Sequence, residues 1–138
     1  MAMCLLTTDR TVCLLVAALL AFVAVGCGSS RSHAISIAHE IGVSKLRADL
    51  QALAASPAGQ QHEIPKTAWP ESVRRFQPLS VQRHMNGMLI VFSHAEREQQ
   101  GMLVMLDATE DPGSGGSGVS YDNLDEGLFW CVEKIRTP

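Results

Sequence analysis

Histidines are the side chains of this chain best suited to bind a metal ion or transfer a proton near neutral pH. A zinc-binding helix carries the pattern His-Glu-x-x-His, and the chain begins that pattern at His39-Glu40 but has Val43 where the second histidine is required. His84 and His94 fall on opposite faces of two predicted strands, about 16 Å apart along the sheet. No metal site is predicted. The histidines are His33, His39, His62, His84 and His94.

Cys131 is the residue that would carry thiol chemistry. A cysteine nucleophile acts as a thiolate, which a nearby base or positive charge must stabilise. Cys131 lies between Trp130 and Val132 in an apolar stretch, and Glu133 shares its strand face and disfavours a second negative charge. We therefore predict a buried, unreactive thiol. A free thiol that forms mixed disulfides is the alternative left open.

Carboxylates gather in the polar segment 107–126, but not in the order of an EF-hand calcium loop. The simpler interpretation is a solvated acidic loop. A weak external calcium site at Asp122-Asn123 and Asp125-Glu126 is the alternative. The glycine-rich run 113–118 is followed by neither Lys-Ser nor Lys-Thr, so it is not a phosphate-binding loop. No serine lies in a G-x-S-x-G turn. These patterns predict no catalytic residues and no cofactor.

The elements that position these side chains begin with helices. Apolar residues recur at helical spacing over 35–55, which predicts one amphipathic helix that Gly42 could split. Ser56-Pro57-Ala58-Gly59 ends it. A short second helix is predicted at 69–76, where Pro70 suits the first helical position and Glu71 the positive end of the helix dipole.

The second half of the chain predicts strands. Asn86-Gly87 is a strong two-residue hairpin signal between strands at 79–85 and 88–95, and a turn at these two residues pairs Met85 with Met88 and Val81 with Phe92. Alternation then places Val81, Ile90 and Phe92 on the face that packs on the long helix. Further strands are predicted at 102–107 and 128–135.

Together these elements predict an α+β domain in which both helices pack on a four-stranded antiparallel sheet. A meander is the simplest strand order, although the long connection 108–127 permits a rearranged edge. A connection of this length in a small domain is either functional or mobile, and its Gly and Ser content favours mobility.

The stretch from Val12 to Cys27 predicts the location of the protein. It is apolar for about fourteen residues, the length of a secretory signal core, and as a helix it would span only about 24 Å of a hydrocarbon core that is about 30 Å thick. The segment Val23-Ala24-Val25-Gly26-Cys27 resembles the lipobox of bacterial lipoproteins, although Ala24 stands where Leu is commonest.

The resemblance implies cleavage before Cys27 and attachment of diacylglycerol to its sulfur, with palmitate among the acyl chains. An ordinary cleaved signal or an uncleaved anchor remain alternatives. The predicted organisation is a signal peptide at 1–26, a flexible tether at 27–34 and one domain at 35–138. With Cys27 acylated and the earlier cysteines removed, Cys131 has no partner for an internal disulfide.

The folded part contains Trp-Pro-x-Ser at Trp69–Ser72, the Asn-Gly hairpin and Ser-Tyr-x-x-Leu-x-x-Gly-x-Phe-Trp at Ser120–Trp130. In these motifs it resembles small bacterial proteins of unassigned function, which supports the fold and implies no activity.

We therefore expect a small non-enzymatic lipoprotein of the cell envelope, held to a membrane through Cys27 and facing the periplasm or the exterior. Its expected role is structural or contact with an envelope protein. The alternative is a ligand-binding module that uses the groove beside 108–127, with Trp69, Tyr121 and Trp130 as the binding surface; an enzyme ranks third. A net charge of −3 without a basic run argues against nucleic acid as a partner.

Overall fold

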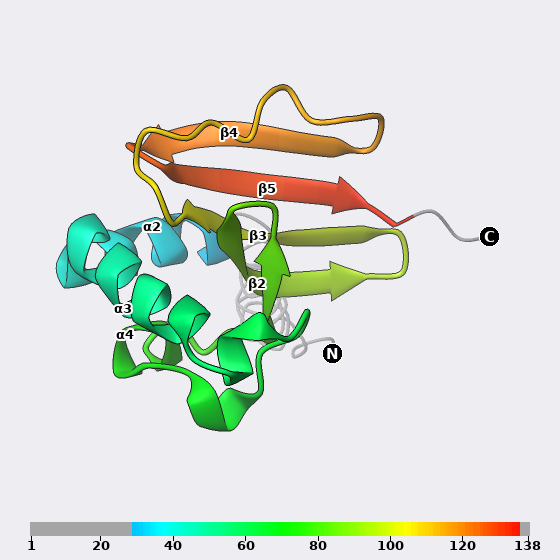
Figure 1. Ribbon diagram of the computed structural model, residues 1–138. Helices are drawn as coiled ribbons and strands as arrows, with labels where there is room; N and C mark the ends of the chain where they lie inside the picture. Colours follow the sequence, from blue (N-terminus) through cyan, green and yellow to red (C-terminus); the bar gives the residue numbers. More distant parts are fainter. Residues whose placement is uncertain (1–28, 136–138) are drawn as a thin grey trace, which may run out of the picture.

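The computed structural model describes residues 29–135, which form an antiparallel five-stranded sheet with helices on one face (Figure 1). The strand order is β1-β2-β3-β5-β4. The α+β class is therefore confirmed. The elements are α2 (Ser29–Ile41), α3 (Val43–Ala55), η1 (Ala58–Gln60), η2 (Lys66–Ala68), α4 (Glu71–Arg74), β1 (Ser80–His84), β2 (Gly87–Ala95), β3 (Glu98–Met105), β4 (Val119–Asp125) and β5 (Leu128–Lys134).

The helical region begins earlier than the sequence predicts and is divided in two. Gly42 adopts a φ of 88°, which a residue with a side chain rarely takes, and separates α2 from α3. The predicted helix at 35–55 is therefore two helices, divided at Gly42, where the sequence allowed a split. Residues 29–34, assigned to the flexible tether, lie in α2, and Ala34 is buried. Residues 27 and 28 of the predicted tether lie outside the described residues.

Two polar side chains of α3 donate hydrogen bonds to backbone carbonyls at the ends of the strands. Arg47 donates hydrogen bonds to the carbonyl of Met105, at 3.1 Å, and to the carbonyl of Glu126. Gln51 donates to the carbonyl of Leu106 at 2.6 Å. Met105 is the last residue of β3, and Leu106 and Glu126 lie just outside strands, so α3 is hydrogen-bonded to one end of the sheet.

The first hairpin is shifted from its predicted register. Residues Met85 and Asn86 form the turn, His84 pairs with Gly87, and Val81 pairs with Ile90. The positive φ of the turn falls on Met85, at 53°, and Gly87 is the first residue of β2. Val81 was predicted to pair with Phe92, two positions from its actual partner, and a shift of two residues leaves the paired strand residues on their predicted faces. Met85, predicted as a strand residue, lies in the turn.

A fifth strand lies in the segment predicted as a long connection. Strand β4 pairs with β5 through a tight turn at Glu126 and Gly127, which places β5 between β3 and β4. The four-stranded meander is therefore wrong. The strand was missed because it is an edge strand with several exposed polar residues, which weakens the apolar signal. The connection that remains is 106–118, in which Pro112 is buried.

The sheet separates two apolar cores. The larger contains α2, α3, α4, Trp69 and Phe76 against one face of the sheet. Among the described residues the second core is built by strand residues alone. The sheet curls so that its two edge strands, β1 and β4, meet and enclose the second core. At this contact the side chains of His84, at the end of β1, and Tyr121, in β4, are 2.7 Å apart. The second core comprises Leu89, Val91, Leu103, Met105, Phe129 and Cys131, with Val119 and Tyr121 packed against it.

We predict that Gly87→Val destabilises the domain because β3 passes too close, and not because of backbone conformation. A Cβ at Gly87 would lie 2.6 Å from the carbonyl oxygen of Val104. Chemical denaturation should give a free energy of unfolding lower by about 1–3 kcal/mol. The matched control is Gly116→Val, where a Cβ meets no atom within 4 Å. Equal stability of the two variants would contradict the close packing of β2 on β3.

Candidate functional site

Three side chains with reactive groups come together in the second core. Tyr121 is the ladder partner of Cys131, so both point to the same face of the sheet. The Tyr121 hydroxyl is 2.7 Å from His84 Nε2 and donates a longer contact, of 3.8 Å, to the sulfur of Met85. The sequence pointed to each residue separately, and only the curl of the sheet brings them together.

The electrostatics of this cluster favour protonated, neutral groups. Cys131 is 1% exposed, and burial, followed by the nearby Glu133 carboxylate, raises the pKa of its thiol to about 12. Burial also raises the pKa of Tyr121, with smaller contributions from Cys131 and Glu133. At neutral pH the thiol and the phenol therefore keep their protons. This arrangement suits hydrogen bonding and packing, and it disfavours a thiolate nucleophile.

The three aromatic residues predicted to form a binding surface are separated by the fold. Trp69 is buried and donates its indole N–H to the carbonyl of Ile64 at 3.0 Å. Trp130 is buried in the larger core, stacked on Phe92 with ring centroids 5.9 Å apart. Tyr121 lies on the other face of the sheet. They do not form a common surface.

A cavity of about 250 Å³ lies beside the first turns of α2, and we call it the α2 cavity. Phe76 and Phe92 supply apolar wall, and Gln77, whose φ of 49° is rare for a non-glycine residue, supplies a polar wall. Its lining residues are Ser30, His33, Ala34, Arg75, Phe76, Gln77 and Phe92.

A second cavity, of about 280 Å³, lies between α3 and α4 and is lined largely by charged groups. Lys45 and Asp49 form an ion pair of 3.1 Å at its wall. The Ser72 hydroxyl, chiefly, and then Lys45 hold the pKa of Asp49 below its usual value. Ser72 is 5% exposed, so its hydroxyl is enclosed against α3. The lining residues are Glu40, Ile41, Lys45, Asp49, Glu71, Ser72 and Arg75.

A third cavity, of about 340 Å³, lies beside β1, β2 and the start of β3, and we call it the sheet cavity. Gln99 is 8% exposed and its amide donates to Gln82 at 3.4 Å, while Gln82 donates to Ser80 at 3.2 Å. The lining residues are Glu63, Leu79, Ser80, Gln82, Val91, His94 and Gln99. None of these three cavities is lined by residues 108–127, which the sequence predicted to border a groove.

Two acidic residues of the connection 106–118, Asp107 and Asp111, accept hydrogen bonds from nearby backbone, whereas one carboxylate oxygen of Glu110 is buried without a hydrogen-bond partner among the described residues. Asp107 accepts hydrogen bonds from the backbone and hydroxyl of Thr109, which lower its pKa, and Asp111 accepts from the backbone of Gly113. Within residues 29–135, histidine, cysteine and carboxylate side chains form no group of three that could hold a metal ion. Cys27, the predicted lipid-attachment residue, lies outside the described residues.

None of the helices within residues 29–135 is long and apolar enough to cross a bilayer. No protein-family model, curated protein or solved structure matches the chain.

The thiol of Cys131 should be unreactive in the folded protein. Alkylation in native buffer should be far slower than in denaturant, because the thiol is buried and its pKa is raised to about 12. The unfolded thiol ionises near pH 8.5, so the folded state loses stability as the pH rises from about 8.5 towards 12. In Cys131→Ala the loss between pH 8 and pH 10 should shrink by on the order of 1 kcal/mol. Fast native alkylation would contradict this assignment.

The contact between the two sheet edges should be measurable as stability. Tyr121→Phe keeps the ring but removes the hydroxyl that meets His84, so the free energy of unfolding should fall by about 1 kcal/mol. Ser120→Ala, an exposed residue of the same strand, is the control and should change stability little. Equal denaturation curves for the two variants would mean that the edges are held together by packing alone.

Proposed function

We propose that this protein is a small lipoprotein of the bacterial cell envelope, anchored through acylated Cys27 and carrying a folded domain with a structural or protein-interaction role. The single observation that carries the proposal is the apolar stretch from Val12 that ends in Val25-Gly26-Cys27. This order of apolar core, small residues and cysteine suits signal cleavage with lipid attachment. Two or three acyl chains hold a protein firmly to a bilayer, since each buried methylene contributes about 0.8 kcal/mol.

The start of the folded body supports an anchor at this position. Helix α2 begins at Ser29, so Gly28 alone separates it from Cys27. A domain joined this closely to acyl chains is held at the membrane surface and does not range far from it. The proposed location is therefore the membrane interface, on the periplasmic or outer side.

The chemistry of the second core supports a role without catalysis. Its thiol and phenol have raised pKa values and are packed among apolar strand residues, where they add to stability. Contact with an envelope protein would use the exposed surface. The side chains of Leu79 and Met85, 54% and 59% exposed, are the apolar groups available there among the described residues.

Ligand binding is the second candidate, and the sheet cavity is the observation that favours it. Gln82 and Gln99 offer amide donors and acceptors beside His94 and Glu63, a set suited to a small polar molecule. The cavity therefore replaces the groove beside 108–127 as the candidate ligand site.

Lipid attachment is tested by feeding cells a labelled fatty acid. The wild-type protein should be labelled, and Cys27→Ser should abolish the label because the acceptor sulfur is removed. Cys13→Ser, within the apolar stretch that is cleaved away, is the matched control and should be labelled like the wild type. Persistent labelling of Cys27→Ser would reject the anchor and with it the proposed function.

A further inference from the structure

The α2 cavity differs from the other two cavities in its charge. The polar side chains that line it, Ser30, His33, Arg75 and Gln77, can all donate hydrogen bonds, and none of its lining residues is acidic. Three carboxylates line the cavity between α3 and α4, and Glu63 lines the sheet cavity. In a chain with a net charge of −3, this is a local surface suited to an anion.

Residues close to Cys27 in the sequence line the α2 cavity. Ser30, which lines it, lies three residues after Cys27, so their Cα atoms are at most about 11 Å apart even when the chain between them is fully extended. His33 follows one helical turn later. If Cys27 carries acyl chains embedded in a bilayer, the mouth of the α2 cavity therefore lies at the level of the lipid headgroups.

We propose that the α2 cavity is a docking site for the phosphate of a phospholipid headgroup, so that the domain is held against the membrane in one orientation. This inference rests on the proposed anchor at Cys27. Arg75 would be the principal phosphate contact, because its planar guanidinium presents several donors to phosphate oxygens. One of its nitrogens is held by Glu40 at 2.9 Å in an exposed ion pair, and the others remain for the ligand.

The apolar wall of the cavity suits the same occupant. Phe76 and Phe92 lie with their ring centroids 6.0 Å apart, and Phe92 stacks on Trp130 beneath. Arg31 lies over the Trp130 ring at 5.9 Å and forms an ion pair with Asp122 at 3.0 Å, so Arg75 is the cation on which the proposal depends. Phe76 and Trp130 are buried, so Phe92, which is partly exposed, supplies the apolar surface that a glycerol or acyl group could contact beside Arg75.

The test uses the full-length lipidated protein in vesicles of phosphatidylglycerol and phosphatidylethanolamine. A fluorophore is attached at Ser36→Cys, an exposed position of α2 outside the cavity lining, or at Asn86→Cys, in the β1–β2 turn beside Tyr121. Native Cys131 is buried and does not compete for the label. The measurement is quenching by iodide, which stays in water. The label at Ser36→Cys should be protected several-fold relative to the same protein in detergent, and the label at Asn86→Cys should not.

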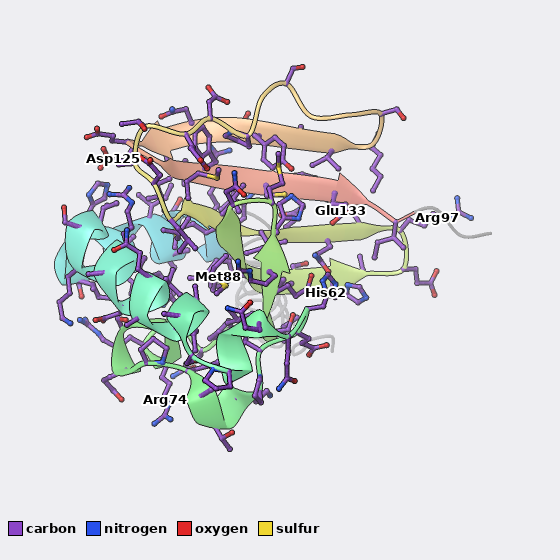
Figure 2. The ribbon with its side chains drawn as sticks, viewed as in Figure 1. His62, Arg74, Met88, Arg97, Asp125 and Glu133 are labelled. Carbon is purple, nitrogen blue, oxygen red and sulfur yellow. The ribbon has the colours of Figure 1, made fainter. Side chains whose placement is uncertain are left out.

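The role of phosphate is tested by Arg75→Gln in the Ser36→Cys protein. This variant should lose most of the protection, and the labelled Ser36→Cys protein with Arg75 intact should lose it as well in vesicles of a phosphate-free glycolipid. The matched control is Arg74→Gln, at the last residue of α4; Arg74 does not line the cavity, it donates to the carbonyl of Thr67 at 3.4 Å and it points outward (Figure 2), so its loss should leave protection unchanged.

Two results would overturn the inference. One is equal quenching at the two labelled positions in phospholipid vesicles, and the other is full protection in Arg75→Gln. The labelled fatty acid is measured on the same preparations. Retained fatty acid without protection rejects the headgroup site and leaves the anchor standing, whereas loss of the fatty acid in otherwise wild-type protein rejects the anchor itself.

Discussion

The structure depends on the burial of both faces of one five-stranded sheet when helices cover only one of them. Helices α2, α3 and α4 pack on one face. The opposite face presents Leu89, Leu103 and Phe129, whose exposure to water would cost several kcal/mol. The sheet avoids this cost by curling until β1 and β4 meet at His84 and Tyr121. Close passage between neighbouring strands is part of the same packing: a Cβ at Gly101 would lie 2.5 Å from the carbonyl oxygen of Ile90.

This packing determines which reactive side chains are buried and which are accessible to solvent. The residues with the greatest intrinsic reactivity, Cys131 and Tyr121, are placed inside the curl, where burial raises the pKa of each and keeps its proton. The polar groups that remain accessible line cavities at the rim of the helical layer and beside β1, β2 and the start of β3. Of the three cavities, the α2 cavity has the lining residues that come first in the sequence, Ser30 and His33.

Several parts of the fold could be predicted because they depend on local patterns. Helical spacing of Leu46, Leu50 and Leu53 predicts the face that α3 buries, and these residues are buried. Alternation in the first hairpin places Val81 and Ile90 on the helical face, and it does so in either register because a shift of two residues preserves the faces. The turn itself was misplaced, since the positive φ expected at Asn-Gly falls on Met85. That choice is set by pairing with β3, which is not local.

The sequence alone determines that this chain is an α+β domain preceded by an apolar stretch ending in Cys27, because composition, periodicity and a short motif carry that information in adjacent residues. It also indicates that Cys131 is a buried thiol, since its neighbours are apolar. Tertiary structure alone decides the order of β5 and β4, the meeting of His84 with Tyr121, and the gathering of Ser30, His33 and Arg75 around one cavity. Each of these results joins residues far apart in the chain, and the packing of the whole sheet determines which of them meet.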